Sequence, residues 1–269
     1  MAKITTVAQN FDIYEGDGLS PYARTGATSA NQILSAGAEG VILGHSEVGD
    51  SPEVVNKKLQ TIVASGEVKG LPTLNLTVLI GESWEEFEGN NEATIAATIK
   101  RQCETVFDGV AKEALQQLTI GYEPKWGSRG SGRDDMPPPQ PTLISACIEA
   151  MRNFVREKYG DEVKPLFIYG GRSTPERTKE ILSDENVDGL ILGSACNTVE
   201  KTLGIASAME EVREGLVKVL ICNFKAYDLP DAYEKYVDRL KELGEDFVVI
   251  LAPAHTDIRA VRSATEARA

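Results

Sequence analysis

The stretch LTIGYE, residues 118–123, is a short apolar run that ends in a carboxylate. It is too short for a helix and too continuously apolar for a strand with one exposed face, so it predicts a β-strand that is buried on both faces. Strands of this kind form parallel sheets that helices cover on both sides. The run therefore indicates an α/β fold, and its last residue marks the point where a buried strand opens into a loop.

Seven further runs of the same kind recur along the chain, and helical patterns lie between them. The runs are ITTVAQ (4–9), GVILG (40–44), LTVLIGE (76–82), LFIYGG (166–171), GLILG (189–193), KVLICNF (218–224) and FVVILAP (247–253). The clearest helical patterns are SPEVVNKKLQTIVASG (51–66), with a serine cap and a glycine stop, TLISACIEAMRNFVREKYG (142–160) and TPERTKEILSD (174–184). The chain thus alternates strands with helices.

Eight strands alternating with helices within 269 residues predict a closed (β/α)₈ barrel that forms a single domain over residues 1–269. The alternative is an open, doubly wound sheet, in which a glycine-rich turn opens directly into a helix. The glycine-rich stretch GSRGSG (127–132) is followed by RDDMPPPQ (133–140), with which no helix begins cleanly. This sequence favours the barrel.

The composition limits the partners that the protein can have. A formal net charge of −13 argues against binding to nucleic acid or to an anionic membrane, although a small anion can bind where cations cluster locally. The four cysteines (Cys103, Cys147, Cys196 and Cys222) are scattered and indicate neither a zinc site nor a disulfide framework. The N-terminal segment lacks a signal-peptide pattern, and no apolar run reaches membrane-spanning length. We therefore expect a soluble, cytoplasmic protein.

Residues that carry chemistry stand at the ends of several predicted strands, where (β/α)₈ barrels place their reactive groups. These positions hold His45, Glu47, Glu123 and Lys225, and the small residues Gly170, Gly171, Gly193 and Ser194. An acid, an imidazole and an ammonium group would converge on one mouth, beside two turns of small residues that suit a phosphate group. The H-x-E pattern of a zinc deaminase lacks its P-C-x-x-C partner here, and we expect neither a metal nor a cofactor.

Four of these segments resemble the signature segments of the triosephosphate isomerase family. They are GHSE (44–47), YEPKW (122–126), YGG (169–171) followed by TPE, and NFK (223–225). The resemblance extends to AQN (8–10), TG (25–26) and APAHTDIRAV (252–261), and it covers nearly the whole chain. It implies a TIM barrel that interconverts dihydroxyacetone phosphate and glyceraldehyde 3-phosphate through an enediolate.

The order of the segments differs from that of the family. In the family, the strand that carries asparagine, an aromatic residue and lysine comes first, whereas NFK here follows the last phosphate-loop segment. The chain thus resembles a circularly permuted triosephosphate isomerase whose first two β/α units have moved to the C-terminus. Because a closed barrel places its first and last strands side by side, its termini can tolerate such a rearrangement.

The resemblance implies a role for each matching residue, in an enzyme family that is a well-known example of this chemistry. Glu123 matches the general base, His45 a neutral donor to the substrate oxygens, and Lys225 a fixed positive charge. The implied substrate-binding residues are Asn223, Gly130, Ser131, Gly132, Gly171, Gly193 and Ser194, and Arg172, which follows YGG in this sequence, is a further candidate. Glu47 would support the site from behind, and Pro124, Lys125, Trp126, Ser128 and Arg129 would belong to a loop that closes over the ligand, as is known for this family.

Two residues at the mouth depart from the family pattern. Arg172 stands where the family has a serine after YGG, and Ser128 replaces an apolar residue at the tip of the loop. A more cationic mouth suits a ligand with more negative charge. We therefore keep an alternative, in which a related barrel binds a phosphorylated and more highly charged ligand, with weak or different activity.

The residues that stabilise the family's dimer also differ. The family pairs a glutamate just after TG with an arginine just after GHSE, and these positions hold Ala27 and Val48 here. The segment FDIYEGDGLSPYAR (11–24) is also longer than its counterpart in the family. We therefore expect a monomer or an altered homodimer.

Overall fold

Eight strands form one parallel sheet in the computed structural model of the chain, which describes residues 1–13, 25–71, 73–128, 131–227, 229 and 232–266. The strands are β1 (Lys3–Thr6), β2 (Gly40–Leu43), β3 (Asn75–Ile80), β4 (Leu118–Tyr122), β5 (Leu166–Gly170), β6 (Gly189–Leu192), β7 (Lys218–Asn223) and β8 (Phe247–Ala252). Each strand overlaps one of the apolar runs in the sequence, so the prediction of eight buried strands is confirmed.

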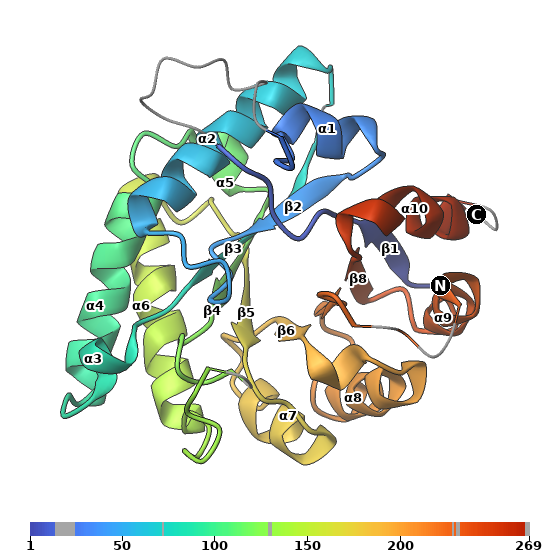
Figure 1. Ribbon diagram of the computed structural model, residues 1–269. Helices are drawn as coiled ribbons and strands as arrows, with labels where there is room; N and C mark the ends of the chain where they lie inside the picture. Colours follow the sequence, from blue (N-terminus) through green and yellow to red (C-terminus); the bar gives the residue numbers. More distant parts are fainter. Residues whose placement is uncertain (14–24, 72, 129–130, 228, 230–231, 267–269) are drawn as a thin grey trace.

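Helices follow every strand and surround the sheet (Figure 1). They are α1 (Ala30–Ser35), α2 (Pro52–Val68), α3 (Trp84–Phe87), α4 (Glu92–Val106), α5 (Lys112–Leu115), α6 (Pro141–Tyr159), α7 (Pro175–Leu182), α8 (Val199–Val212), α9 (Tyr233–Leu240) and α10 (Ile258–Glu266), with short 3₁₀ turns η1 (Ser194–Cys196) and η2 (His255–Asp257). Within the described residues, no helix combines the length and the apolar character that crossing a membrane requires.

The sheet closes on itself. Its strands follow the order β1-β8-β7-β6-β5-β4-β3-β2, and the two outer strands, β1 and β2, meet through a parallel bridge between Ala8 and Val41. There the amide of Ala8 donates to the carbonyl oxygen of Gly40 at 3.0 Å, and the amide of Ile42 donates to that of Ala8 at 2.9 Å. The expected closed (β/α)₈ barrel is confirmed, and the open doubly wound sheet is excluded.

The first and last strands of the chain lie side by side. β1 pairs with β8 in parallel, with Lys3 opposite Val248 and Thr6 opposite Leu251. The N-terminal ammonium group lies 3.6 Å from the carboxylate of Glu245, just before β8. Figure 1 accordingly shows β1, in blue, and α10, in red, on the same side of the barrel.

Local signals in the sequence set the ends of the helices. The hydroxyl of Ser51 accepts from the amide of Val54 at 3.4 Å and caps α2, which begins with Pro52. Thr174 caps α7 in the same way, again ahead of a proline. The glycine stop predicted for α2 was wrong: the helix continues through Gly66 to Val68. A Cβ at Gly66 would lie 2.7 Å from a methyl group of Leu74, so this glycine allows close packing rather than ending the helix.

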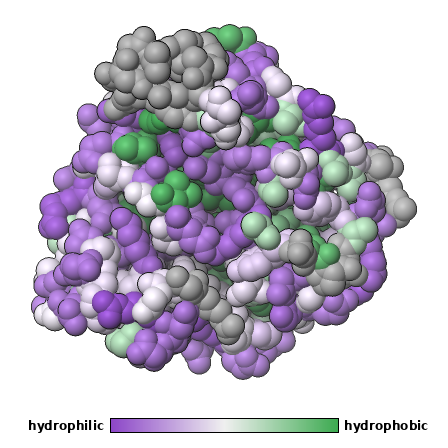
Figure 2. Space-filling view, viewed as in Figure 1, coloured by the Kyte–Doolittle hydropathy of each residue, from purple (hydrophilic) through white to green (hydrophobic). Residues whose placement is uncertain are grey.

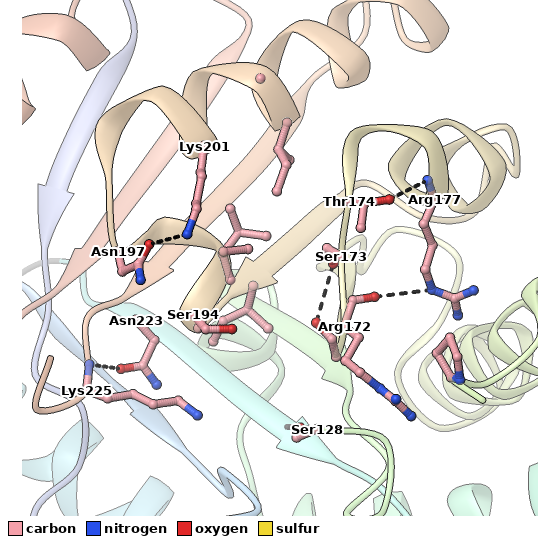
Figure 3. A pocket seen from close by; sticks show the side chains of 18 of the residues that line it. Ser128, Arg172, Ser173, Thr174, Arg177, Ser194, Asn197, Lys201, Asn223 and Lys225 are labelled. Carbon is pink, nitrogen blue, oxygen red and sulfur yellow. Dashed lines mark hydrogen bonds between the residues drawn. The ribbon is translucent and has the colours of Figure 1, made fainter. Parts of the chain in front are cut away.

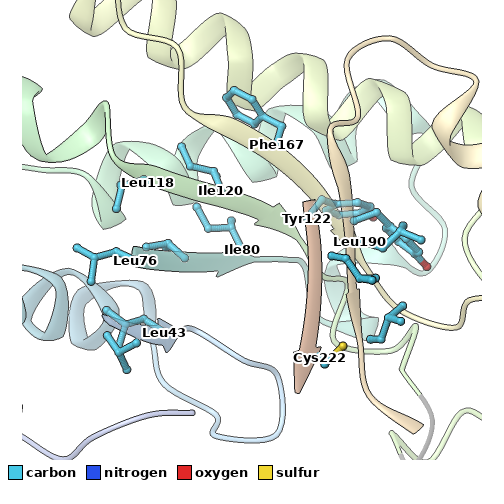
Figure 4. Packing of buried hydrophobic residues seen from close by; sticks show 14 of the residues in the cluster. Leu43, Leu76, Ile80, Leu118, Ile120, Tyr122, Phe167, Leu190 and Cys222 are labelled. Atoms are coloured by element: carbon cyan, nitrogen blue, oxygen red, sulfur yellow. The ribbon is translucent and has the colours of Figure 1, made fainter. Parts of the chain in front are cut away.

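The apolar residues form two layers of core. Inside the barrel, Ile42, Leu79, Ile168 and Ile221 belong to one cluster of side chains that the strands direct inward. The larger cluster lies between the strands and the surrounding helices, and Figure 4 shows part of it, including Leu43 and Ile120. On the face seen in Figure 2, hydrophilic residues predominate and apolar groups form only small patches. Burial of these two layers is the main source of stability.

We expect Ile168→Ala to destabilise the barrel strongly. Ile168 is fully buried in the inner cluster, so removing its side chain leaves a cavity that neighbouring strands cannot fill. The free energy of unfolding should fall by about 2–5 kcal/mol, as measured by urea denaturation. Val68→Ala is the control, because Val68 is 86% exposed, and it should change stability by no more than about 0.5 kcal/mol. Equal denaturation midpoints for the two variants would contradict this description of the core.

Candidate active site

A cavity of about 750 Å³ lies at the carboxyl ends of the strands. Its wall includes His45, which follows β2, Glu123, which follows β4, Asn223 at the end of β7, and Lys225. Figure 3 shows Asn223 and Lys225 on one side of the cavity and Arg172 on the other. The structure therefore brings together the acid, the imidazole and the amine that the sequence places at three distant strand ends.

The alternation of side chains along β4 and β7 directs Glu123 and Asn223 inward. Ile120 and Tyr122 pack in the outer cluster, so Glu123 follows the inward-facing parity of its strand. In β7 the same rule places Ile221 inside and Cys222 outside. The alternation of side chains does not explain how His45 reaches the cavity.

A left-handed turn at Gly44 brings His45 into the cavity. Gly44 has φ +77, and a Cβ there would lie 2.2 Å from the carbonyl oxygen of Leu79. Only glycine fits this position. The turn ends the alternation of β2 and presents the next residue, His45, to the mouth of the barrel.

The imidazole of His45 is hydrogen-bonded as a neutral ring. Its Nδ1 accepts from the amide of Glu47 at 3.1 Å, which leaves Nε2 to carry the ring proton. Nε2 lies 3.5 Å from Oε1 of Glu123, and both side chains are buried. The ring thus holds its remaining proton next to a carboxylate inside the cavity.

The carboxylate of Glu123 is held by two donors. Its Oε2 accepts from the amide of Ser46 at 2.9 Å, and its Oε1 accepts from the hydroxyl of Ser128 at 3.4 Å. Glu123 is only 5% exposed. Few waters can therefore reach the group, and these protein donors hold it in place.

Lys225 occupies a strained backbone position. Its φ of 48° is the only positive φ at a non-glycine residue in the described part of the chain, a conformation that costs of the order of 1–3 kcal/mol. Its amide donates to Oδ1 of Asn223 at 3.0 Å, and Nε2 of Gln9 donates to its carbonyl oxygen at 2.8 Å. The ammonium group forms an ion pair with Glu47. These contacts fix a positive charge at the mouth.

Small residues also line the cavity, as the sequence predicts. Gly171, Gly193 and Ser194 are all part of its wall. A Cβ at Gly193 would lie 3.1 Å from Cε of Lys225, so a larger residue would push that lysine aside. A Cβ at Gly171 would lie 2.2 Å from the hydroxyl oxygen of Tyr169. Glycine therefore keeps the neighbouring polar groups in place as well as exposing the backbone.

The start of the loop after β4 is anchored on Glu82, a residue to which the sequence analysis gave no role. Its Oε1 accepts hydrogen bonds from the indole of Trp126 at 2.8 Å and from the hydroxyl of Tyr122 at 3.0 Å. Its backbone carbonyl accepts from the backbone amide of Lys125 at 3.0 Å. Glu82 is fully buried, and this burial raises the pKa of its carboxyl group. Pro124 and Trp126 are also buried, which fixes the first turn of the loop.

The other residues of the predicted loop differ in whether they line the cavity. Ser128 lines the cavity, whereas Lys125, Ser131 and Gly132 are not among the described residues that form its wall. The hydroxyl of Ser131 donates to the carbonyl of Trp126 at 3.0 Å and so stabilises the loop itself. Two predicted site residues, Arg129 and Gly130, lie outside the described residues, as does most of the lengthened segment, residues 14–24.

Arg172 lines the cavity, but its guanidinium group is directed at the loop. It donates to the carbonyl oxygens of Gly127 at 3.2 Å, Asp134 at 3.2 Å and Met136 at 2.6 Å. Next to it, Arg177 donates to the carbonyl of Arg172 itself at 3.2 Å. A role of Arg172 in attracting extra anionic charge therefore competes with three contacts inside the protein.

Taken together, these groups suit proton transfer next to a carbonyl group. A buried carboxylate can take the proton, a neutral imidazole can donate to an oxygen, and a fixed ammonium can stabilise negative charge. Among the described residues, no group of three histidine, cysteine, aspartate or glutamate side chains is arranged to hold a metal ion.

Comparisons with known proteins agree with this chemistry. A sequence model described as triosephosphate isomerase matches residues 1–209. The chain is 34% identical to the triosephosphate isomerase of Alkaliphilus oremlandii over 204 residues, which are 74% of each protein. It is 35% identical to that of Bacteroides fragilis over 192 residues, 69% of this chain and 70% of the relative.

A solved structure supports the same assignment. The crystal structure of triosephosphate isomerase from Bartonella henselae superposes with a TM-score of 0.57 and 26% sequence identity, covering 77% of this chain and 76% of that one. The sequence matches span well over half of the chain and, at above 30% identity, more than two thirds of the relatives. On this evidence the chain belongs to the triosephosphate isomerase family.

Proposed function

We propose that the protein interconverts dihydroxyacetone phosphate and glyceraldehyde 3-phosphate by proton transfer through an enediolate. The observation that carries this proposal is the buried contact between His45 and Glu123 in a cavity that also holds Lys225. Family membership supplies the reaction, and the three groups supply the chemical means.

Glu123 is the general base in this proposal. It removes a proton from the carbon next to the substrate carbonyl and returns it to the neighbouring carbon. Its carboxylate is bound to the amide of Ser46 and the hydroxyl of Ser128. Glu123 and Ser128 both line the cavity, so the carboxylate is held where the substrate would bind.

His45 and Lys225 stabilise the charge that develops on the substrate oxygens. His45 offers the Nε2 proton, because its Nδ1 is occupied by the amide of Glu47. Lys225 and Asn223 line the same wall, and the ion pair with Glu47 keeps the ammonium in place without a ligand. Donors positioned in advance in this way contribute about 10²–10³-fold each in rate.

The phosphate group binds near Gly171, Gly193 and Ser194, which line the same cavity. Backbone amides at small residues can approach an anion closely, and the side chains there do not obstruct it. Ser131 and Gly132 belong to the loop after β4, and the buried residues Pro124 and Trp126 form the fixed start of this loop.

The alternative ligand, a more highly charged phosphorylated molecule, has one observation in its favour. Arg177 and Lys201 line the cavity beyond the proposed phosphate position, and the volume of about 750 Å³ is in the range of sites for larger ligands. The contacts of Arg172 with loop carbonyls weigh against it. Calorimetry in which a sugar bisphosphate binds no tighter than a monophosphate would dismiss this alternative.

Glu123→Gln should lower kcat by about 10²–10⁴-fold, because an amide of the same size cannot accept the proton. KM should change little, since the shape of the side chain is kept. A coupled assay for the two triose phosphates measures both constants. Glu104→Gln, at an exposed position on α4, is the matched control and should behave like the wild type. Wild-type activity in Glu123→Gln would show that another group is the base.

We also propose that the chain is a circular permutation of the family's usual order. The match to the family model ends at residue 209, and the remaining residues supply β7 and β8, which lie between β6 and β1 in the sheet. The strand with NFK, which comes first in the family, is β7 here. The adjacent ends of the chain make such an order compatible with a closed barrel.

A chain that starts at Glu214, runs to Ala269 and continues through a flexible glycine–serine linker from Met1 to Arg213 should fold and keep its activity. The cut lies in the turn between α8 and β7, at the start of the exposed residues 214–217. Circular dichroism and the isomerase assay test this. An insoluble or inactive product, when the wild type is active, would contradict the proposed equivalence of the two orders.

We propose that the protein is a monomer. Val48, which replaces the family's charged residue, is 41% exposed, and Thr25 and Gly26 are exposed as well. Without the ion pair between subunits, little in this region fixes a partner. Sedimentation at micromolar concentration should give a species of about 29 kDa, the mass of one chain (29.1 kDa). A stable species of twice that mass would refute the proposal.

A further inference from the structure

Arg172 connects two parts of the loop after β4 that are separated in sequence. Its Nε donates to the carbonyl of Gly127, near the start of the loop, and its two Nη atoms donate to those of Asp134 and Met136, near the end. We propose that Arg172 is a positioning residue, which holds the loop ends so that Ser128 stays next to the general base. This inference rests on the proposed function, because it assigns that role to Glu123.

The contacts require an arginine. Its guanidinium group carries five N–H donors in a rigid plane, so one side chain can bind three carbonyls at once. A lysine at this position has one ammonium group and cannot reach the same three acceptors together. Arg172 is half-buried, which protects these hydrogen bonds from competing water.

The base of Arg172 is itself fixed. It follows β5 by two residues, and Nε of Arg177 donates to its carbonyl oxygen at 3.2 Å. Arg177 also hydrogen-bonds to the carbonyl of Pro139, just beyond the loop. Because Arg177 belongs to α7, the loop is tied through Arg172 to a strand and a helix of the barrel.

The position of Gly127 determines that of Ser128. Gly127 is buried, and a Cβ there would lie 2.9 Å from Cγ of Pro124 and 3.3 Å from Cγ of Pro139. The next residue, Ser128, donates to Oε1 of Glu123 at 3.4 Å. Arg172 therefore influences the carboxylate through the loop and needs no contact with the substrate.

The opposing interpretation is that Arg172 binds the substrate phosphate. Both interpretations predict reduced activity in Arg172→Ala, so activity alone does not separate them. They differ in the loop and in anion binding. A positioning residue stabilises the loop against opening and leaves inorganic phosphate binding unchanged, whereas a phosphate ligand does the reverse.

The experiment compares Arg172→Ala and Arg172→Lys with the wild type. We expect Arg172→Ala to lower kcat about tenfold, with the inhibition constant of inorganic phosphate within about twofold of the wild type. Trypsin should cleave after Arg133, inside the loop, about tenfold faster, because local opening becomes more frequent. Arg172→Lys keeps the charge but should recover only a small part of each effect. In a Ser128→Ala background, Arg172→Ala should cost less than it does alone.

Arg152→Lys is the matched control. Arg152 also donates to a carbonyl, that of Asn186, but it lies at the opposite end of β6 from the cavity. This variant should change neither the cleavage after Arg133 nor kcat. Unchanged cleavage in Arg172→Ala, or weaker phosphate inhibition in step with lost activity, would overturn the proposal. If the wild type has no isomerase activity, the proposed function fails, and the cleavage rates still decide whether Arg172 holds the loop.

Discussion

Closure of the parallel sheet is the constraint on which the site depends. Only when β1 meets β8 and Ala8 meets Val41 do all strand ends face one cavity. The ion pair between Lys225 and Glu47 joins residues 178 positions apart, and Lys225 reaches it from the seventh strand in the chain. Barrel geometry fixes which strands are neighbours in space, whatever their order along the chain. Catalytic groups can therefore stay together while the connections between strands change.

The buried carboxylate of Glu82 lowers the stability of the fold, but it also fixes the start of the loop after β4. Burial raises its pKa, and its Oε2 has no hydrogen-bond partner among the described residues. A buried polar atom without a partner lowers stability by about 1–3 kcal/mol. In return, its other oxygen holds Tyr122 and Trp126 and so fixes the start of the loop beside Glu123. The residue that fixes the start of this loop, Glu82, thus lies outside the cavity.

The two-residue period of β-strands decides which of these features the sequence could predict. Apolar runs located every strand, and the same alternation places Glu123 and Asn223 inward. It also contains an unused signal for Glu82: Val78 and Ile80 face the helices, so Glu82 must do the same. The contacts of Arg172 could not be predicted in this way, because they depend on the path of a loop without periodicity. The role of Gly66 inside α2 could not be predicted either, since the close approach of Leu74 is visible only in the folded structure.

The electrostatics of the cavity show why an acidic protein can receive an anion. The chain has a net charge of −13, yet Arg172, Arg177, Lys201 and Lys225 line one cavity. Each of them is already held by a carbonyl, an amide oxygen or a carboxylate of the protein. Their positions are therefore set before a ligand arrives, and little energy is lost to reorganisation when charge develops. The same contacts use part of the hydrogen-bonding capacity of these cations. A cavity whose cations already form hydrogen bonds within the protein suits a ligand with one phosphate group better than a ligand with several. Each further phosphate group would have to displace contacts that stabilise the fold.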